Sequence, residues 1–134
     1  MKIEGQCHCG AIAYEAEVDP AKAAMCHCSD CQTFSGAPFR ASVVAKAEDF
    51  HLLKGEPRLY VKTAESGNRR AQAFCANCGS PIYAADAENP KFFSLRLGAV
   101  KQRAEIAPQR QIWCESALDW AQNVSGLPAV ARQK

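Results

Sequence analysis

The amino-acid sequence predicts a mainly β fold with little helix and two zinc sites, and three observations support this prediction. Short segments rich in β-branched and aromatic residues alternate with turns that contain Gly, Pro, Asn and Asp. No long segment repeats its apolar residues with the period of an amphipathic helix. Seven of the eight cysteines form three tight clusters, a pattern typical of metal ligation. With 48% hydrophobic and 22% charged residues, we expect one soluble domain over residues 1–134, with its core over about residues 3–120 and a polar C-terminal tail.

The order of the elements follows from the turn signals. Strands are expected at residues 1–6 and 11–18, where Asp19-Pro20 ends the second one. The central cysteine cluster is expected to join a strand end to a short helical turn, which Ser29 or Asp30 caps and Ser35-Gly36-Ala37-Pro38 ends. A short turn or helix at residues 117–122 precedes the tail. Between these segments, we expect strands at residues 39–45, 51–53, 58–63, 70–75, 80–84, 92–97 and 110–114.

The first and third cysteine clusters share one local pattern. The segments Cys7-His8-Cys9-Gly10 and Cys75-Ala76-Asn77-Cys78-Gly79 each end in Cys-Gly. A glycine after a ligand lets the backbone adopt a positive φ and direct amide N–H groups at the thiolate. Two such loops, far apart in sequence, would clamp distant parts of the chain around one ion. We therefore predict that Cys7, Cys9, Cys75 and Cys78 hold a structural zinc.

The central cluster has three cysteines and no such glycine. Structural zinc takes four protein ligands, whereas catalytic zinc keeps one position open. The sulfurs of Cys26, Cys28 and Cys31 come from one short stretch and would approach a metal from one side. We therefore predict a catalytic zinc at these three residues. Disulfides are the alternative, and a fourth ligand from Cys114 would make both sites structural.

Other notable side chains have ordinary interpretations. His8 and His27 each lie between two predicted ligands, where strand alternation points their side chains away from the metal. We therefore expect them to be neighbours of the metal site and not ligands. Cys114 is expected to be a buried free thiol in a strand rather than a ligand. Four aromatic residues are interpreted as core or pocket wall: Phe34, Phe39, Trp113 and Trp120.

Charge and hydropathy exclude several partners. Seven bound thiolates and two zinc ions would change the formal charge from +2 to roughly −1, so basicity gives no argument for nucleic acid. No apolar run has the length of a membrane span, and Met-Lys-Ile-Glu-Gly-Gln is not typical of a signal peptide. We expect a cytoplasmic protein with no membrane partner, in which thiols stay reduced.

The three cysteine segments, read together, resemble a known family. The segment Gly5-Gln6-Cys7-His8-Cys9-Gly10, the central cluster with Ser35-Gly36, and Phe74-Cys75-Ala76-Asn77-Cys78-Gly79-Ser80 are similar to those of the glutathione-dependent formaldehyde-activating enzyme (GFA) family, which also includes centromere protein V. The resemblance runs from about residue 3 to about residue 120. It implies the β-tent fold, the same division into structural and catalytic zinc, and the joining of formaldehyde to glutathione. No segment matches a glutathione pocket.

This resemblance and the open zinc site together lead to a functional expectation. Three thiolates make zinc a mild Lewis acid, for which a substrate thiol is a better fourth ligand than water. The expected function is a zinc-dependent carbon–sulfur lyase that acts on a small thiol/aldehyde adduct, resembling S-(hydroxymethyl)glutathione synthase. His27, Asp30 and Ser35 lie near enough in sequence to be considered as its general acid. The alternative is a noncatalytic zinc-binding interaction module, and a nucleic-acid binder is the third hypothesis.

Overall fold

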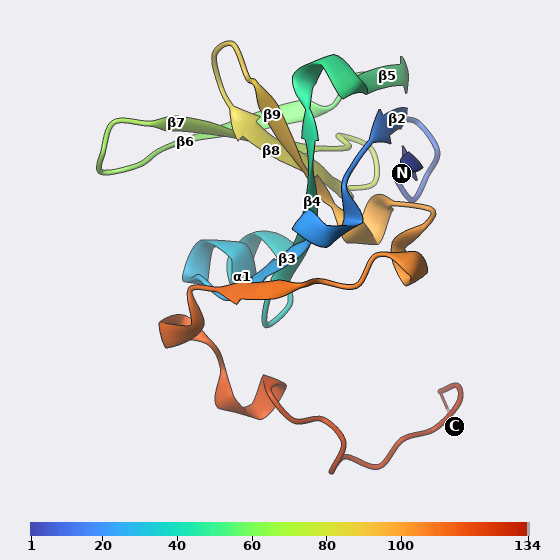
Figure 1. Cartoon of the computed structure of the whole chain (residues 1–134), viewed down its shortest axis with the longest axis vertical. Coiled ribbons are helices and arrows are strands. Elements are labelled where there is room, and N and C mark those ends of the chain that lie inside the picture. Colours follow the sequence, from blue (N-terminus) through green and yellow to red (C-terminus); the bar gives the residue numbers. More distant parts are fainter. Residues whose placement is uncertain (134) are drawn as a thin grey trace.

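A computed structural model describes residues 1–133 and confirms a mainly β protein (Figure 1). The described residues form ten strands, one α-helix and several single-turn 3₁₀ helices. The strands and the α-helix are β1 (Lys2–Gln6), β2 (Ala13–Glu17), β3 (Ala24–Cys26), α1 (Ser29–Ser35), β4 (Arg40–Lys46), β5 (Phe50–Lys54), β6 (Arg58–Thr63), β7 (Arg69–Phe74), β8 (Pro81–Asp86), β9 (Phe92–Arg96) and β10 (Arg110–Ile112). The 3₁₀ helices are η1 (Pro20–Lys22), η2 (Ala47–Asp49), η3 (Leu97–Ala99), η4 (Arg103–Glu105), η5 (Cys114–Ser116) and η6 (Asp119–Ala121).

The strands form two sheets with the apolar core between them. The smaller sheet has the order β1-β2-β5, and the larger has the order β10-β3-β4-β9-β8-β7-β6. All neighbouring strands are antiparallel except β10 and β3, which are parallel. Ile3 and Tyr14 of the small sheet join Val43, Ile82 and Leu95 of the large sheet in one buried cluster. Alternation along the strands therefore places one face of each sheet in the core.

The large sheet carries polar side chains on its opposite face. In β4, Val43 and Ala45 are buried in the core, so Arg40 and Ser42 point to the other side. Arg96 of β9 lies directly opposite Ser42 in the ladder and shares its face. The segment that carries the central cysteines, β3 and α1, adjoins this face through the β3–β4 pairing.

The C-terminal part of the sequence differs from expectation in two ways. The predicted strand at residues 110–114 ends at Ile112, because Trp113 adopts a positive φ of 58° that takes the backbone out of the ladder. Cys114 consequently starts η5 and is exposed, so the prediction of a buried thiol in a strand is wrong.

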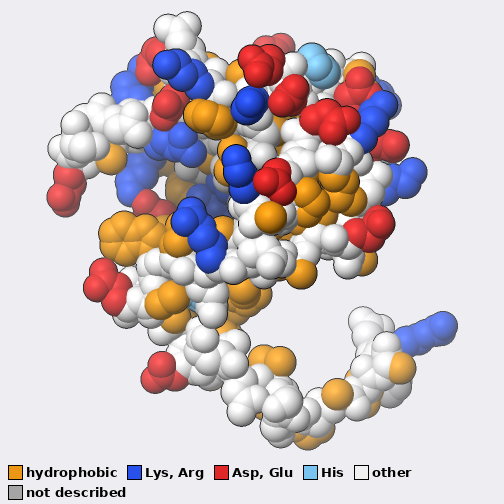
Figure 2. Space-filling view, in the orientation of Figure 1, with side chains coloured by type: hydrophobic (Ala, Val, Ile, Leu, Met, Phe, Trp, Pro, Cys, Tyr) orange, Lys and Arg blue, Asp and Glu red, His pale blue; other side chains and the backbone are white. Residues whose placement is uncertain are grey.

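The C-terminal tail extends away from the folded body of the molecule (Figure 1). Residues 122–133 are exposed and project away from the body, which shows intermixed acidic and basic side chains on the face seen in Figure 2. The tail was predicted to be polar, yet it also exposes Val124, Leu127 and Val130. Within the described structure, no helix has the length and apolar character needed to cross a membrane.

Candidate metal centres

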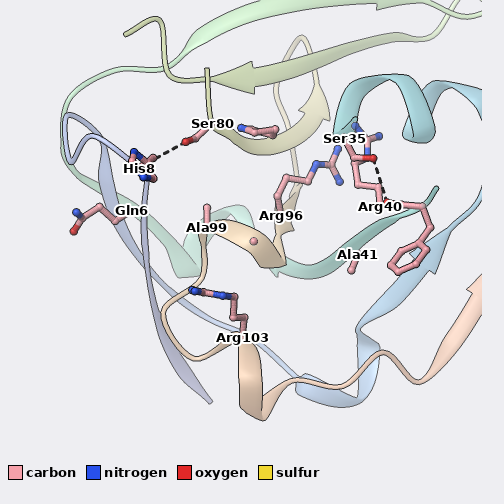
Figure 3. Close-up of a pocket in the computed structure, with 12 residues that line it drawn as sticks. Gln6, His8, Ser35, Arg40, Ala41, Ser80, Arg96, Ala99 and Arg103 are labelled. Atoms are coloured by element: carbon pink, nitrogen blue, oxygen red, sulfur yellow. Dashed lines mark hydrogen bonds between the residues drawn. The ribbon is translucent and has the colours of Figure 1, made fainter. Parts of the chain in front are cut away.

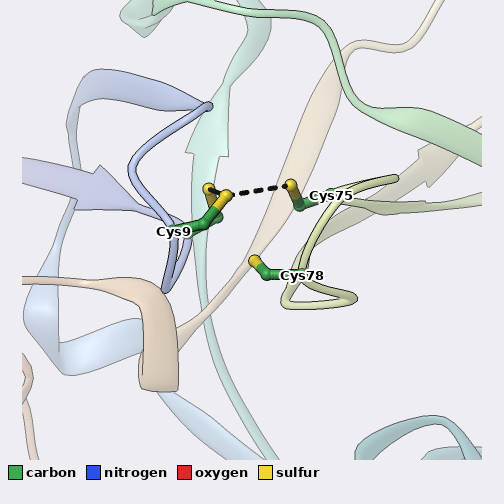
Figure 4. Close-up of side chains that lie close together, drawn as sticks. Cys9, Cys75 and Cys78 are labelled. Atoms are coloured by element: carbon green, nitrogen blue, oxygen red, sulfur yellow. Dashed lines mark hydrogen bonds between the residues drawn. The ribbon is translucent and has the colours of Figure 1, made fainter.

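Four cysteines from two distant loops meet in one cluster, which we call cluster one. The sulfur atoms of Cys7, Cys9, Cys75 and Cys78 all lie within 4.8 Å of one another. Figure 4 shows the sulfur of Cys9 facing those of Cys75 and Cys78 across the gap between the loops. Cys7 and Cys75 are buried, whereas Cys9 and Cys78 reach the surface. The structure thus brings together all four residues that the sequence grouped.

The first loop of cluster one is closed by its own backbone. Cys7 N–H donates to the Ile12 carbonyl oxygen at 3.1 Å, and Ile12 N–H donates back to Cys7 Sγ at 3.2 Å. Gly10 supplies the turn with a φ of 81°, a conformation that is unstrained only for glycine. The Cys-Gly pattern therefore does what the sequence predicted: it turns the chain and directs an amide at the sulfur.

The second loop repeats this arrangement and is linked to the first. Cys75 N–H donates to the Ser80 carbonyl oxygen at 3.0 Å, and Gly79 has a φ of 78°. The Ser80 hydroxyl oxygen accepts from His8 N–H at 3.0 Å and lies 3.2 Å from Cys78 Sγ. Hydrogen bonds to that sulfur, led by the Ser80 hydroxyl and followed by the backbone N–H groups of Ser80 and Cys9, lower the pKa of Cys78 to about 5. Ser80 thus connects the two loops and favours a thiolate at Cys78.

The spacing of the sulfur atoms in cluster one fits a zinc ion. A tetrahedral ion with zinc–sulfur bonds of about 2.3 Å requires sulfur atoms about 3.8 Å apart. Cys7 Sγ and Cys9 Sγ are 3.7 Å apart, and Cys9 Sγ and Cys75 Sγ are 3.8 Å apart. Four thiolates at this spacing are a donor set suited to a soft or borderline divalent metal.

Three cysteines form the second group, which we call cluster two. The sulfur atoms of Cys26, Cys28 and Cys31 lie within 4.8 Å of one another, and within residues 1–133 no fourth Cys, His, Asp or Glu completes this group. Cys26 ends β3, and Cys28 caps α1 by accepting from Cys31 N–H at 3.3 Å. The sequence instead predicted Ser29 or Asp30 as the cap. The predicted cap is wrong because the sulfur of Cys28 accepts the hydrogen bond at the N-cap of α1, which a hydroxyl or carboxylate oxygen usually accepts.

The segment of cluster two is supported from a distant part of the chain. His27 is buried and its Nε2 lies 2.7 Å from Gln111 Oε1, while its backbone N–H donates to the Ile112 carbonyl oxygen at 3.1 Å. The side-chain amide of Gln32 donates to the carbonyl oxygens of His27 and Ser116 at 2.8 Å and 3.1 Å. His27 therefore occupies the neighbouring, non-ligating position that the sequence favoured.

A cleft of about 650 Å³ opens beside cluster two. Cys28 forms part of its wall, together with Phe34, Trp113 and the ion pair of Asp30 with Lys62. Trp113 is 58% exposed, so it is a pocket wall and not a core residue. Cys31, unlike Cys28, is buried, and this burial raises the pKa of its thiol to about 12. A bound cation would offset this penalty by stabilising the thiolate.

Several predicted candidates lie outside both clusters. Cys114 and His8 belong to neither group of sulfur atoms. Trp120 is 67% exposed on η6, so the core interpretation is wrong for this residue. Among the residues considered as a general acid, Ser35 donates to the carbonyl oxygen of Phe39 at 3.1 Å and lies away from the Cys28 cleft.

Two arginines near cluster two, Arg40 and Arg96, were not among the residues predicted for the site. Arg40 and Arg96 both bond to the side-chain oxygen of Gln72, at 3.0 Å and 3.4 Å. Arg96 also donates to Ser42 Oγ at 2.6 Å and to Ser94 Oγ at 3.2 Å. The available signal was weak: Arg40 begins and Arg96 ends a segment of mostly apolar or small residues, and such strand ends are usually exposed to solvent.

Together, the fold and the clusters define a class: a small β domain with one four-cysteine and one three-cysteine group, each able to hold a metal ion. The GFA family model, described as "Glutathione-dependent formaldehyde-activating enzyme", matches residues 2–116. This chain therefore belongs to the glutathione-dependent formaldehyde-activating enzyme family, as the cysteine segments predicted.

Individual relatives agree with this assignment. An uncharacterized lyase of Schizosaccharomyces pombe is 31% identical over 98 residues, which are 72% of this chain and 68% of the relative. A protein of Halomonas elongata named "Putative glutathione-dependent formaldehyde-activating enzyme" is 24% identical over 127 residues, covering 91% of this chain and 81% of the relative. The crystal structure of a Rhodobacter sphaeroides protein aligns with a TM-score of 0.63 and 21% identity over 81% of this chain and 98% of that one, which shows the shared fold.

Proposed function

We propose that this protein is a zinc-dependent carbon–sulfur lyase that makes or breaks the bond between a small thiol and an aldehyde carbon. The observation that supports this proposal most directly is the three-sulfur group of cluster two beside a cleft. The names of the family and of its relatives point to the same chemistry, with glutathione and formaldehyde as the reactants.

In this proposal the two clusters have different roles. Cluster one holds a structural zinc with four thiolates. Cys26, Cys28 and Cys31 of cluster two hold the catalytic zinc. When bound there, zinc supplies Lewis acidity and a position for a soft fourth ligand, which is the chemistry that a reacting thiol needs.

The residues around cluster two prepare the cleft for a small substrate. Phe34 and Trp113 give it apolar walls, which reduce the access of water to the reacting atoms. Among His27, Asp30 and Ser35, Asp30 is the residue that shares the cleft with Cys28, in its ion pair with Lys62. The proton that the hemithioacetal oxygen gains on bond formation would therefore pass through this pair or through solvent in the cleft.

The test is the rate of exchange between free formaldehyde and its thiol adduct. Exchange NMR with labelled formaldehyde and glutathione, or with a smaller thiol, should show acceleration by the zinc-loaded protein. Cys28→Ser should abolish the acceleration, whereas Cys114→Ser, the same chemical change at an exposed cysteine outside both clusters, should keep it. If no thiol is accelerated at any concentration tested, the noncatalytic zinc module becomes the better description.

A further inference from the structure

Two positively charged side chains lie next to each other on the polar face of the large sheet. Arg96 is only 7% exposed, and Arg40 shares the acceptor oxygen of Gln72 with it. Burial and the nearby charge of Arg40 lower the pKa of Arg96 to about 9, which leaves its guanidinium protonated at neutral pH. The molecule therefore keeps the charge of Arg96 away from bulk water, with the half-buried Arg40 beside it.

Within residues 1–133, neither of these arginines is paired with a carboxylate. In the described part of the chain, the ion pairs within 4 Å involve other basic groups, and the partners of Arg40 and Arg96 are neutral oxygens. Arg40 Nε is buried without a hydrogen-bond partner. Buried charges are usually paired, because an isolated one loses its hydration without compensation. An unpaired set of this kind is typical of a site that receives an anion.

A cavity of about 510 Å³ gives an anion access to these groups. Arg40, Arg96 and Arg103 line it from three different elements, and its lining contains no Asp or Glu (Figure 3). Ser35 and Ser80 add hydroxyl groups to its wall. The cavity lies between the C-terminal end of α1, at Ser35, and the second loop of cluster one, at Ser80.

The arginine pair is close to cluster two. Arg40 lies directly opposite Cys26 in the β3–β4 ladder, so both side chains leave the same face of the sheet. Arg40 also forms part of the cleft wall beside Cys28. Three thiolates around a divalent ion leave about one negative charge, which offsets only part of the two arginine charges.

We propose that Arg40, backed by Arg96 and Gln72, binds the carboxylate of the substrate and so selects thiols that carry an acidic group. This inference rests on the proposed function, because it names the class of thiol that cluster two would receive. Glutathione belongs to that class, and so do simple mercapto acids. Arg40 can donate to this carboxylate from its two terminal NH₂ groups, of which Gln72 occupies one N–H.

The test compares two thiols that differ only in the acidic group. Calorimetric titration of the zinc-loaded protein with 3-mercaptopropionate and with 3-mercapto-1-propanol should show roughly tenfold tighter binding of the acid, or more. Arg40→Gln should remove this preference and leave the affinity for the alcohol unchanged. Arg58→Gln, which removes the same charge from an exposed position on β6 outside these cavities, should retain the preference.

The outcomes separate this inference from the function on which it rests. Equal affinity of the unmodified protein for both thiols, or a preference that persists in Arg40→Gln, would overturn the carboxylate site and leave thiol binding intact. Binding of neither thiol would overturn the proposed function itself. Zinc content and the circular dichroism spectrum of Arg40→Gln should equal those of the unmodified protein. If this variant loses zinc, Arg40→Lys is the second variant to test. It keeps the positive charge and should lose part of the preference for the acidic thiol.

Discussion

Clusters one and two use the same ligand atom but are built in opposite ways. Cluster one joins two loops whose nearest sulfurs come from residues 66 positions apart, and each loop is closed by its own hydrogen bonds. Cluster two takes its sulfurs from one short segment, which β10 and β4 hold in place. A metal in cluster one would therefore cross-link the chain, whereas a metal in cluster two would sit on a scaffold that the protein already provides. This is the difference expected between a folding site and a working site, which are the roles proposed for clusters one and two.

The largest expected effect comes from a buried ligand of cluster one. Cys7→Ser should lose the metal of this cluster and most of the folded structure, because structural zinc binding contributes on the order of 10 kcal/mol to folding. The measurement is metal content together with thermal unfolding followed by circular dichroism. Retention of a cooperative unfolding transition near that of the unmodified protein would contradict the structural role.

The matched change in cluster two should have a smaller effect on the fold. Cys31 is buried like Cys7, so Cys31→Ser tests the same chemistry in the other cluster. We expect this variant to lose one equivalent of metal and its activity, while the far-ultraviolet spectrum of the sheets is retained. If Cys7→Ser and Cys31→Ser unfold alike, the division into folding and working sites is wrong.

A third change weakens the support of cluster two without touching a ligand. Gln111→Ala removes the partner of the buried His27 side chain, which lies between two ligands without being one. Loss of a contact made directly by a ligand typically lowers metal affinity about 10-fold to 100-fold, so this less direct change should lower it by about 10-fold at most. Chelator competition should detect this loss in one of the two metal equivalents. A uniform loss in both equivalents would show that the clusters are not independent.

The smallest effect is expected at the eighth cysteine. Cys114 is exposed on η5, so Cys114→Ala should retain two metal equivalents and change the free energy of unfolding by less than about 0.5 kcal/mol. Metal analysis and denaturant unfolding measure both quantities. A fall to one equivalent would place Cys114 in cluster two and remove its open position.

The sequence predicted what depends on local spacing. The turns at Gly10 and Gly79 and the end of α1 at Gly36 have the positive φ values that the cysteine and glycine patterns required. The strand at Arg58–Thr63 has the predicted bounds. These features follow from residues that are neighbours along the chain, for which conformational preference and spacing carry the information.

Other features depend on contacts between distant segments and could not be predicted in this way. Arg40 reaches Gln72 and Arg96 only through the register of four strands, which no local pattern specifies. The early end of β10 depends on the backbone of Trp113, a residue whose usual preference is for extended conformations. The single-domain organisation and the cytoplasmic location remain predictions.

The parallel pairing of β3 with β10 also sets an order of events during synthesis. Both loops of cluster one have been made once the ribosome has passed Ser80, so all four ligands of that site are present while the last 54 of the 134 residues are still missing. The cysteines of cluster two are made much earlier, yet the hydrogen-bond partners of His27 and Gln32 follow 84 residues later. A nascent chain therefore exposes the central thiols after the first site has closed. Of the two clusters, the one proposed to be catalytic is the last to be assembled.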